Sequence, residues 1–295
     1  MITKNILLRS RKMFADYHVH TYYSDDSETP METQVERAIS LGLREICFTD
    51  HVDYGIKRDW DDPRGMEYRK GGPGEPKLMA LANVDYPRYF KEIEELKRKY
   101  KDQIIIRAGL EFGIQTITIP QYDKLYSKYG DKLDFVLLSV HQVDNQELWT
   151  QDFQRGKTQE EYNRRYYEEI LAVINQFKNY DALAHLDLIT RYDKNGIYPF
   201  EKVQDIIKEI LKIIIAEGKG LELNTSSWRY GLSDTQPSRD ILRLYKDLGG
   251  KYITLGSDAH TPEYIATHFK DAKDILEDEI GISLCGFEVV RDGIQ

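Results

Sequence analysis

Short apolar runs alternate with longer amphipathic segments along most of the chain. The apolar runs occupy residues 14–19, 45–49, 104–110, 135–140, 182–184, 221–223 and 252–255, and several are rich in Ile, Val and Phe, as buried parallel strands are. Segments with apolar residues at helical spacing lie between them, at 30–41, 159–177, 200–217 and 238–248. This alternation predicts seven βα units arranged around a parallel sheet.

The predicted helices carry recognisable start signals. Thr29 with Glu32, and Thr158 with Glu161, have the spacing of a capping box, in which the two side chains satisfy each other's backbone N–H groups. Of the other two helices, one follows Pro199 and the other begins at Ser238, and both end before a glycine. These signals support the predicted boundaries.

The segment 53–83 lacks apolar periodicity and contains the run GGPG, so we expect a long loop rather than a linker between domains. Its basic and aromatic residues are Arg58, Trp60, Arg64, Tyr68, Arg69 and Lys70. Such a composition fits either a solvated loop or a lid over a substrate. In both cases we expect residues 1–295 to form a single domain.

Polar side chains follow each predicted strand at the point where it ends. They are His18 with His20, Asp50 with His51, Glu111, His141, His185, Asn224, and Asp258 with His260. In a closed β/α barrel the carboxyl ends of the strands meet at one mouth, where active sites are built. We therefore expect these side chains to converge, although they span most of the chain.

Six of the seven histidines belong to this set, whereas His268 falls in a predicted helix and is expected to have an ordinary structural role. A lone histidine at a strand end is usually a hydrogen-bonding residue, but six together with carboxylates indicate a metal cluster. Cys47 and Cys285 show no metal-binding spacing, so the ligands would be nitrogen and oxygen, which suit zinc, iron or manganese. Asp16 fits either a ligand or, as we prefer, a carboxylate that orients an imidazole.

Composition and net charge limit the classes of molecule that the protein is expected to bind. With 41% apolar and 31% charged residues, the chain has the balance of a soluble globular protein. Its formal net charge of −9 argues against broad attraction to nucleic acid or to an anionic membrane. The apolar stretch near the amino terminus is too short for a signal-peptide core or a membrane span, so we expect a cytoplasmic protein.

The strand-end motifs resemble those of the PHP phosphoesterases, in the same order and over nearly the whole chain. They are DYHVH at 16–20, TDH at 49–51, LE at 110–111, SVH at 139–141, AH at 184–185 and GSDAH at 256–260. Two further segments, 187–192 and 223–229, resemble the monofunctional histidinol-phosphate phosphatases of that family. The resemblance implies a distorted (β/α)7 barrel, similar to a TIM barrel, with two to three divalent metal ions at the carboxyl ends of its strands.

The resemblance also implies how the ligands are shared. The first metal would be bound by His18, His20, Glu111 and Asp258, the second by His141 and His185 with Glu111 as a bridge, and the third by His51 and His260. An oxygen ligand from residues 24–26 would complete the third site. Many members carry a histidine where this chain has Asp26, and Asp25 is a close competitor for that place. Asp16, Asp50 and Asn224 are expected to support the ligands.

The implied reaction is hydrolysis of a small phosphomonoester, with L-histidinol phosphate as the expected substrate in histidine biosynthesis. Arg191 and Arg229 match the family's phosphate-binding arginines, and a guanidinium can hold a phosphate with two parallel hydrogen bonds. Their alternative is a surface salt bridge. The leaving alcohol would be protonated by Asp26, by His260 or by water, and the sequence does not choose among these donors.

Two other functions are compatible with these motifs. A PHP nuclease or exonuclease would act on phosphodiesters, but the chain lacks the basic stripe that would follow an extended nucleic acid. A non-catalytic regulatory domain that binds metal would be expected to have lost ligands, whereas the ligand set here is nearly complete.

Overall fold

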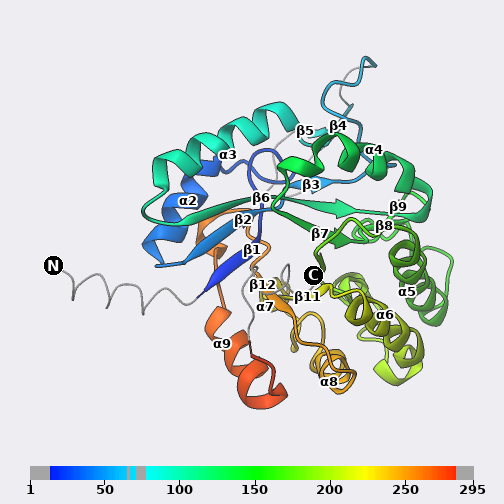
Figure 1. Ribbon diagram of the computed structural model, residues 1–295. Helices are drawn as coiled ribbons and strands as arrows, with labels where there is room; N and C mark the ends of the chain where they lie inside the picture. The colour runs from blue at the N-terminus through cyan, green and yellow to red at the C-terminus, as the bar shows by residue number, and fades with distance from the viewer. Residues whose placement is uncertain (1–13, 65–66, 71–77, 284–295) are drawn as a thin grey trace.

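The computed structural model describes residues 14–64, 67–70 and 78–283, and its strands form a parallel sheet curved into a nearly closed barrel (Figure 1). Along the sheet the strands are β1 (Ala15–Val19), β2 (Glu45–Phe48), β6 (Ile105–Gly113), β7 (Phe135–Ser139), β10 (Ala182–Leu183), β11 (Gly220–Asn224) and β12 (Ile253–Gly256). The short strand β3 (His51–Val52) pairs with β6 beyond the end of β2. The predicted distorted (β/α)7 architecture is confirmed.

The barrel closes between its first and last strands through backbone hydrogen bonds. The N–H of His20 donates to the carbonyl of Ala259 at 2.9 Å, and the N–H of Ala259 donates to the carbonyl of His18 at 3.3 Å. The register of β1 against β2 shifts between Asp16 and Val19. This closure places the first of the strand-end motifs, DYHVH at 16–20, beside the last, GSDAH at 256–260.

Helices surround the sheet on its outer side (Figure 1). They are α2 (Met31–Ser40), α3 (Tyr86–Tyr100), α4 (Ile119–Tyr129), α5 (Gln159–Gln176), α6 (Gln204–Ala216), α8 (Arg239–Asp247) and α9 (Phe269–Asp274), with the short α7 (Ser226–Arg229) after β11. The four helices expected from the sequence are present. The predicted segment 200–217 is divided into a 3-10 turn (Phe200–Lys202) and α6, while α3 and α4 were not among the predicted helices.

The two predicted capping boxes have different outcomes. The Thr158 side chain accepts a hydrogen bond from the N–H of Glu161, as expected, and the Glu161 carboxylate accepts one from the N–H of Thr158. The prediction of a capping box at the start of α2 is wrong, because Pro30 is the N-cap residue and no side chain caps the helix. The Thr29 hydroxyl instead donates to the carbonyl of His260 at 2.8 Å. This tertiary hydrogen bond at the barrel mouth replaces the predicted capping contact with the helix.

The segment 53–83 contains more structure than the predicted long loop. Strands β4 (Glu67–Lys70) and β5 (Leu78–Leu81) pair antiparallel and project beside α4 in Figure 1. The glycines and prolines that favoured a loop fall at 71–77, between the two strands and outside the described residues. The side chains of Tyr68, Arg69 and Lys70 also lie outside the description, so the lid hypothesis stays a prediction.

The core has two parts that follow the alternation of side chains along the strands. Val136 and Leu138 of β7 belong to the large cluster packed beneath the helices. Phe135 and Leu137 belong to a small inner cluster with Tyr17, Cys47, Ala182 and Ala184, which fills the barrel. Within the described part of the chain, no helix is long and apolar enough to cross a bilayer.

Ile210 provides a test of this packing, because it is fully buried on the face of α6 that covers the sheet. We expect Ile210→Ala to lower the free energy of unfolding by about 2–5 kcal/mol, through lost burial and the cavity left behind. Urea unfolding of the metal-loaded protein measures the change. Ile117→Ala is the control, since that side chain is 53% exposed and its loss should cost under about 0.5 kcal/mol. Equal losses in the two variants would contradict the packing.

Candidate metal centre

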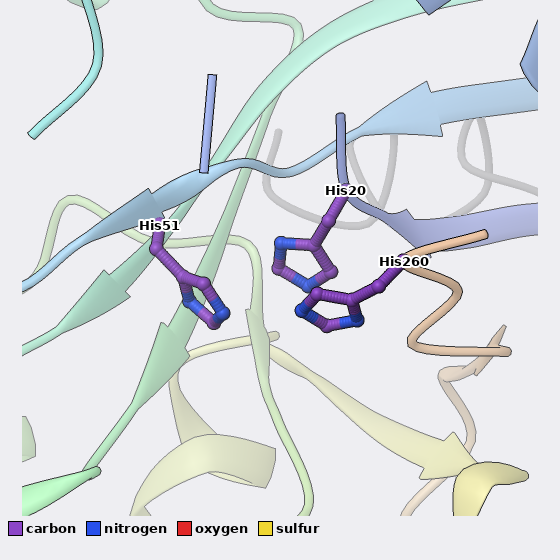
Figure 2. Close-up of side chains that lie close together, drawn as sticks. All are labelled: His20, His51 and His260. Atoms are coloured by element: carbon purple, nitrogen blue, oxygen red, sulfur yellow. The ribbon is translucent and has the colours of Figure 1, made fainter. Parts of the chain in front are cut away.

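Six histidines from separate segments meet at the carboxyl ends of the strands, as expected. Figure 2 shows three of them, His20 after β1, His51 in β3 and His260 after β12, with their rings turned toward one another. The ring of His20 stacks on that of His260 with centroids 4.1 Å apart and on that of His51 at 4.2 Å. The closure of the barrel therefore brings together side chains up to 242 residues apart, from His18 to His260.

Glu111 lies at the middle of this group and is fully buried. Its Oε2 atom lies 2.8 Å from Nδ1 of His51 and 3.2 Å from Nε2 of His18. Its Oε1 atom lies 2.9 Å from Nε2 of His185 and 3.1 Å from Nε2 of His141. The sequence placed Glu111 after the end of its strand, but β6 continues to Gly113, so Glu111 projects from the strand itself. Its two oxygens therefore face two different sets of imidazoles.

Asp258 contributes a second carboxylate to one side of the group. Its Oδ1 atom lies 3.4 Å from Nε2 of His20 and 3.7 Å from Nε2 of His18. The backbone at Asp258 has a φ of 54°, which is unusual for a residue with a side chain. Arg229 donates to the carbonyl of Asp258 at 2.9 Å, so it helps to hold this turn of the backbone.

The structure separates the two candidates for the remaining oxygen ligand. The Oδ2 atom of Asp26 lies 3.1 Å from Nε2 of His260 and 3.5 Å from Nε2 of His51. Asp25 is instead paired with the buried ammonium of Lys57. Of the two, Asp26 is therefore the one placed beside the histidines.

The donor atoms are suited to metal ions. His18 Nε2, His20 Nε2 and Glu111 Oε2 are buried and have no hydrogen-bond partner among the described residues, although each lies close to the others. Buried polar atoms are normally hydrogen-bonded, and several that converge without a partner point to a ligand they share. Geometrically possible ligand groups include His18, His20 and Glu111, as well as His51, Glu111 and His141.

Electrostatics favour the ionised form of the central carboxylate and hold protons on several of the imidazoles around it. Burial alone would raise the pKa of Glu111, but the positive imidazoles of His18, His141 and His51 outweigh it and hold that pKa well below its ordinary value. Burial, together with His260 and His51, lowers the pKa of His20 well below its ordinary value. Nearby carboxylates outweigh burial at three other imidazoles, raising the pKa of His141 to about 9 and those of His18 and His51 well above the ordinary value. A divalent cation binds an ionised carboxylate and a neutral imidazole, so it would displace the protons of these rings.

Several side chains support the histidines from outside, and two of them were missed from the sequence. Glu222 Oε1 lies 2.6 Å from His18 Nδ1, and Asp53 Oδ1 lies 2.8 Å from His141 Nδ1. Glu222 interrupts an apolar strand with a charged residue, which was a usable signal for an inward-facing position. Asp53 lies in the segment that was assigned to a loop, so nothing linked it to His141.

The three residues expected to support the ligands do so in different ways. Asp16 accepts from the N–H of His18 and from the Ser257 hydroxyl, so it holds backbone rather than an imidazole. Asp50 accepts from the hydroxyl of Ser24, and that hydroxyl lies 3.2 Å from His20 Nδ1. Asn224 has its amide nitrogen within 3.5 Å of Asp258 and of His18.

The two predicted phosphate-binding arginines lie in different surroundings. Arg191 lines a cavity of about 130 Å³ together with Glu111, His185, Asp258 and His260. Its guanidinium donates to Asp258 at 3.3 Å and to Gln236 at 2.7 Å. Arg229 does not line that cavity and packs between the rings of Tyr230 and Tyr264. The structure therefore places Arg191, but not Arg229, at the cavity beside the histidines and carboxylates.

Comparison with known proteins identifies the family. The PHP domain model matches residues 16–226, which include nearly all the strands and motifs described above. The chain belongs to the PHP family.

Individual relatives of this PHP protein agree with that assignment. The curated histidinol-phosphatase of Lactococcus lactis subsp. lactis (strain IL1403) is 35% identical over 252 residues, covering 83% of each chain. The histidinol-phosphatase of Bacillus subtilis (strain 168) is 27% identical, over 83% of this chain and 92% of its own. A crystal structure of histidinol phosphate phosphatase from Lactococcus lactis, complexed with zinc, L-histidinol and phosphate, superposes with a TM-score of 0.76. It is 31% identical and covers 92% of this chain and 95% of its own. The PHP protein is therefore a metal-dependent phosphoesterase.

Glu222→Gln tests the support of the metal centre. The substitution keeps the volume of the side chain and removes the negative charge next to His18 Nδ1, so we expect zinc affinity to fall roughly 10- to 100-fold. Titration against a competing chelator measures this. Glu209→Gln is the matched control, because Glu209 is exposed on α6. Zinc affinity within twofold of the wild-type value in Glu222→Gln would contradict the assigned role.

Proposed function

We propose that this PHP protein hydrolyses L-histidinol phosphate to L-histidinol and inorganic phosphate, with the help of two to three zinc, manganese or iron ions. The observation that carries the proposal is the placement of Arg191 beside Asp258 at the wall of a small cavity whose floor is formed by Glu111 and the histidines. The similarity to the histidinol-phosphatase of Lactococcus lactis over most of both chains supports the same substrate.

The proposed ligand sets are arranged around three carboxylates, Glu111, Asp258 and Asp26. His18, His20, Glu111 and Asp258 would hold the first ion, Glu111, His141 and His185 the second, and His51, His260 and Asp26 the third. Divalent ions bound there would supply a nucleophile from water at neutral pH and stabilise negative charge on the phosphoryl oxygens. Glu111, with an oxygen directed at each set, would keep the first two ions close together.

Arg191 would bind the phosphoryl group and orient it over the metal ligands. Its guanidinium is almost fully buried, and the ring of Tyr230 covers it at 4.1 Å. A buried, planar donor of this kind matches a phosphate dianion better than a flexible lysine does. Arg229 would contribute indirectly, because the carbonyls of Ser257 and Asp258 already accept from its guanidinium.

The remaining walls of the cavity suit a small amine with an aromatic ring. Tyr192, Trp149 and Tyr230 provide flat apolar surfaces, and Glu147 provides a negative charge. Asp26, His260 and water at the same cavity are the candidate donors of a proton to the departing alcohol, and a side chain that binds the third ion would not serve as the donor. A volume of about 130 Å³ also favours a small phosphomonoester over a nucleic-acid strand.

Release of inorganic phosphate from L-histidinol phosphate by the metal-loaded protein tests the substrate. We expect Arg191→Ala to lower kcat/KM roughly 10- to 150-fold, the effect of losing a charged hydrogen bond worth ~1.5–3 kcal/mol. Arg191→Lys should recover only part of the loss, because the forked geometry is missing. Arg243→Ala, an exposed arginine on α8, serves as the control.

The same assays separate the proposal from its rivals. Nucleotides released from single-stranded DNA, with no phosphate from L-histidinol phosphate, would replace it with a nuclease. Absence of hydrolysis with every metal, in a protein that binds metal normally, would leave a regulatory domain.

Metal analysis of Asp26→Asn tests the third ligand set. We expect this variant to retain the first two ions and to lose at least half of the third under conditions that saturate the wild-type protein, because Asp26 is the only carboxylate proposed for that ion. Asp25→Asn is the matched comparison, and it should keep all the ions since Asp25 faces Lys57. Loss of the third ion in Asp25→Asn alone would reverse the assignment.

A further inference from the structure

A second cavity, of about 280 Å³, lies behind the wall that carries Arg191. The charged residues of its lining are all acidic, namely Asp187, Glu201, Asp234 and Asp240, and none of the described lining residues is Lys, Arg or His. Tyr167, Tyr198 and Phe200 supply aromatic surface. An acidic and aromatic lining is complementary to an organic cation.

Two buried polar groups of this lining lack partners within the described chain. Asp187 is 3% exposed, and its Oδ1 atom has no hydrogen-bond partner, while Oδ2 accepts from the N–H of Ser238 at 2.9 Å. The hydroxyl of Tyr198, a residue 8% exposed, is likewise unpartnered. Unsatisfied buried groups are costly, so a carboxylate oxygen and a hydroxyl at one cavity indicate a ligand that donates to both.

A cation is already close to one of these rings. The ammonium of Lys202 lies 5.4 Å from the ring centre of Tyr198, although Lys202 is exposed and does not line the cavity. Asp234 and Asp240 are paired with Arg239 and Arg243. Asp187 is therefore the buried carboxyl of the lining that forms no ion pair among the described residues, and burial raises its pKa to about 7.

The two cavities share a wall made by one 3-10 turn, Leu188–Tyr192. Leu188, Arg191 and Tyr192 line the cavity at the metal centre, whereas Asp187 and Thr190 line the second cavity. A direct chain of hydrogen bonds also joins them. The Gln236 amide nitrogen donates to the carbonyl of Asp187 at 3.2 Å, and its Oε1 atom accepts from Arg191 at 2.7 Å.

We propose that the second cavity is an effector site for a small aromatic amine, whose ammonium binds Asp187 and whose occupancy changes the position of Arg191. The ligand would satisfy Asp187 Oδ1 and place its ring against Tyr198 and Phe200. Because Asp187 is the N-cap residue of the turn that carries Arg191, movement of one would displace the other. Binding at the two cavities is then coupled, and each ligand alters the affinity of the other by the same factor.

Calorimetric titration of the metal-loaded protein with phenethylamine tests the site, with 2-phenylethanol as the uncharged analogue. We expect the amine to bind at least tenfold more tightly than the alcohol. Asp187→Asn, which removes the charge, and Ile197→Trp, which fills the rim at a side chain 60% exposed, should each weaken amine binding at least tenfold. Glu209→Gln, on the exposed face of α6, should bind like the wild type.

The variants distinguish this site from the metal centre, which could also receive an amine. Binding that persists unchanged in Ile197→Trp, or equal affinities for the amine and the alcohol, would overturn the proposal. For the coupling, we expect saturating phenethylamine to change the affinity for inorganic phosphate at least fivefold in the wild type and not in Ile197→Trp. Phosphate affinity that is the same with and without bound amine would overturn the coupling. These binding measurements do not depend on the identity of the hydrolysed substrate.

Discussion

The buried carboxylate of Glu111 is the interaction on which the rest of this structure depends. A carboxylate without solvent is strongly unfavourable unless positive groups or hydrogen bonds surround it. Here Ser139 donates to it at 2.6 Å, and the imidazoles of His18, His51, His141 and His185 all lie within 3.2 Å of its oxygens. Glu111 and these side chains come from five strands or from the residues directly after them, so the side chains surround Glu111 only when the barrel is closed.

The histidines around Glu111 are held by a layer of acidic and hydroxyl groups on the side away from that carboxylate. Glu222 holds the ring of His18, Asp53 holds that of His141, and Ser24 contacts that of His20. Each contact fixes a ring's orientation and makes the imidazole more basic toward a metal. Lys57 joins this layer by bridging Asp53 and Asp25, which keeps Asp25 away from the histidines and leaves Asp26 beside them.

Two of the described residues with a strained backbone lie at the same place. His185 and Asp258 both have positive φ values, 20° and 54°, and both contribute a donor atom to the centre. Such conformations cost about 1–3 kcal/mol each and persist only where surrounding contacts enforce them. Glu222 accepts from the N–H of His185 at 3.0 Å, and Arg229 donates to the carbonyl of Asp258. Arg229 thus lies behind the site, as part of the frame that positions Asp258.

The sequence by itself determined the order of strands and the positions of the metal-binding motifs, because buried strands and strand-end polar residues leave local patterns. It also identified the family, since the motifs recur in a definite order. Only the tertiary structure decided which residues meet. Glu222 contacts a histidine 204 positions away, and Asp53 contacts one 88 positions away. The hydroxyl of Thr29 donates to the carbonyl of His260 and does not cap the helix as predicted. The placement of Asp26 rather than Asp25 beside the histidines depends on the pairing of Asp25 with Lys57, and that of Arg191 apart from Arg229 on contacts with Asp258, which no local spacing encodes.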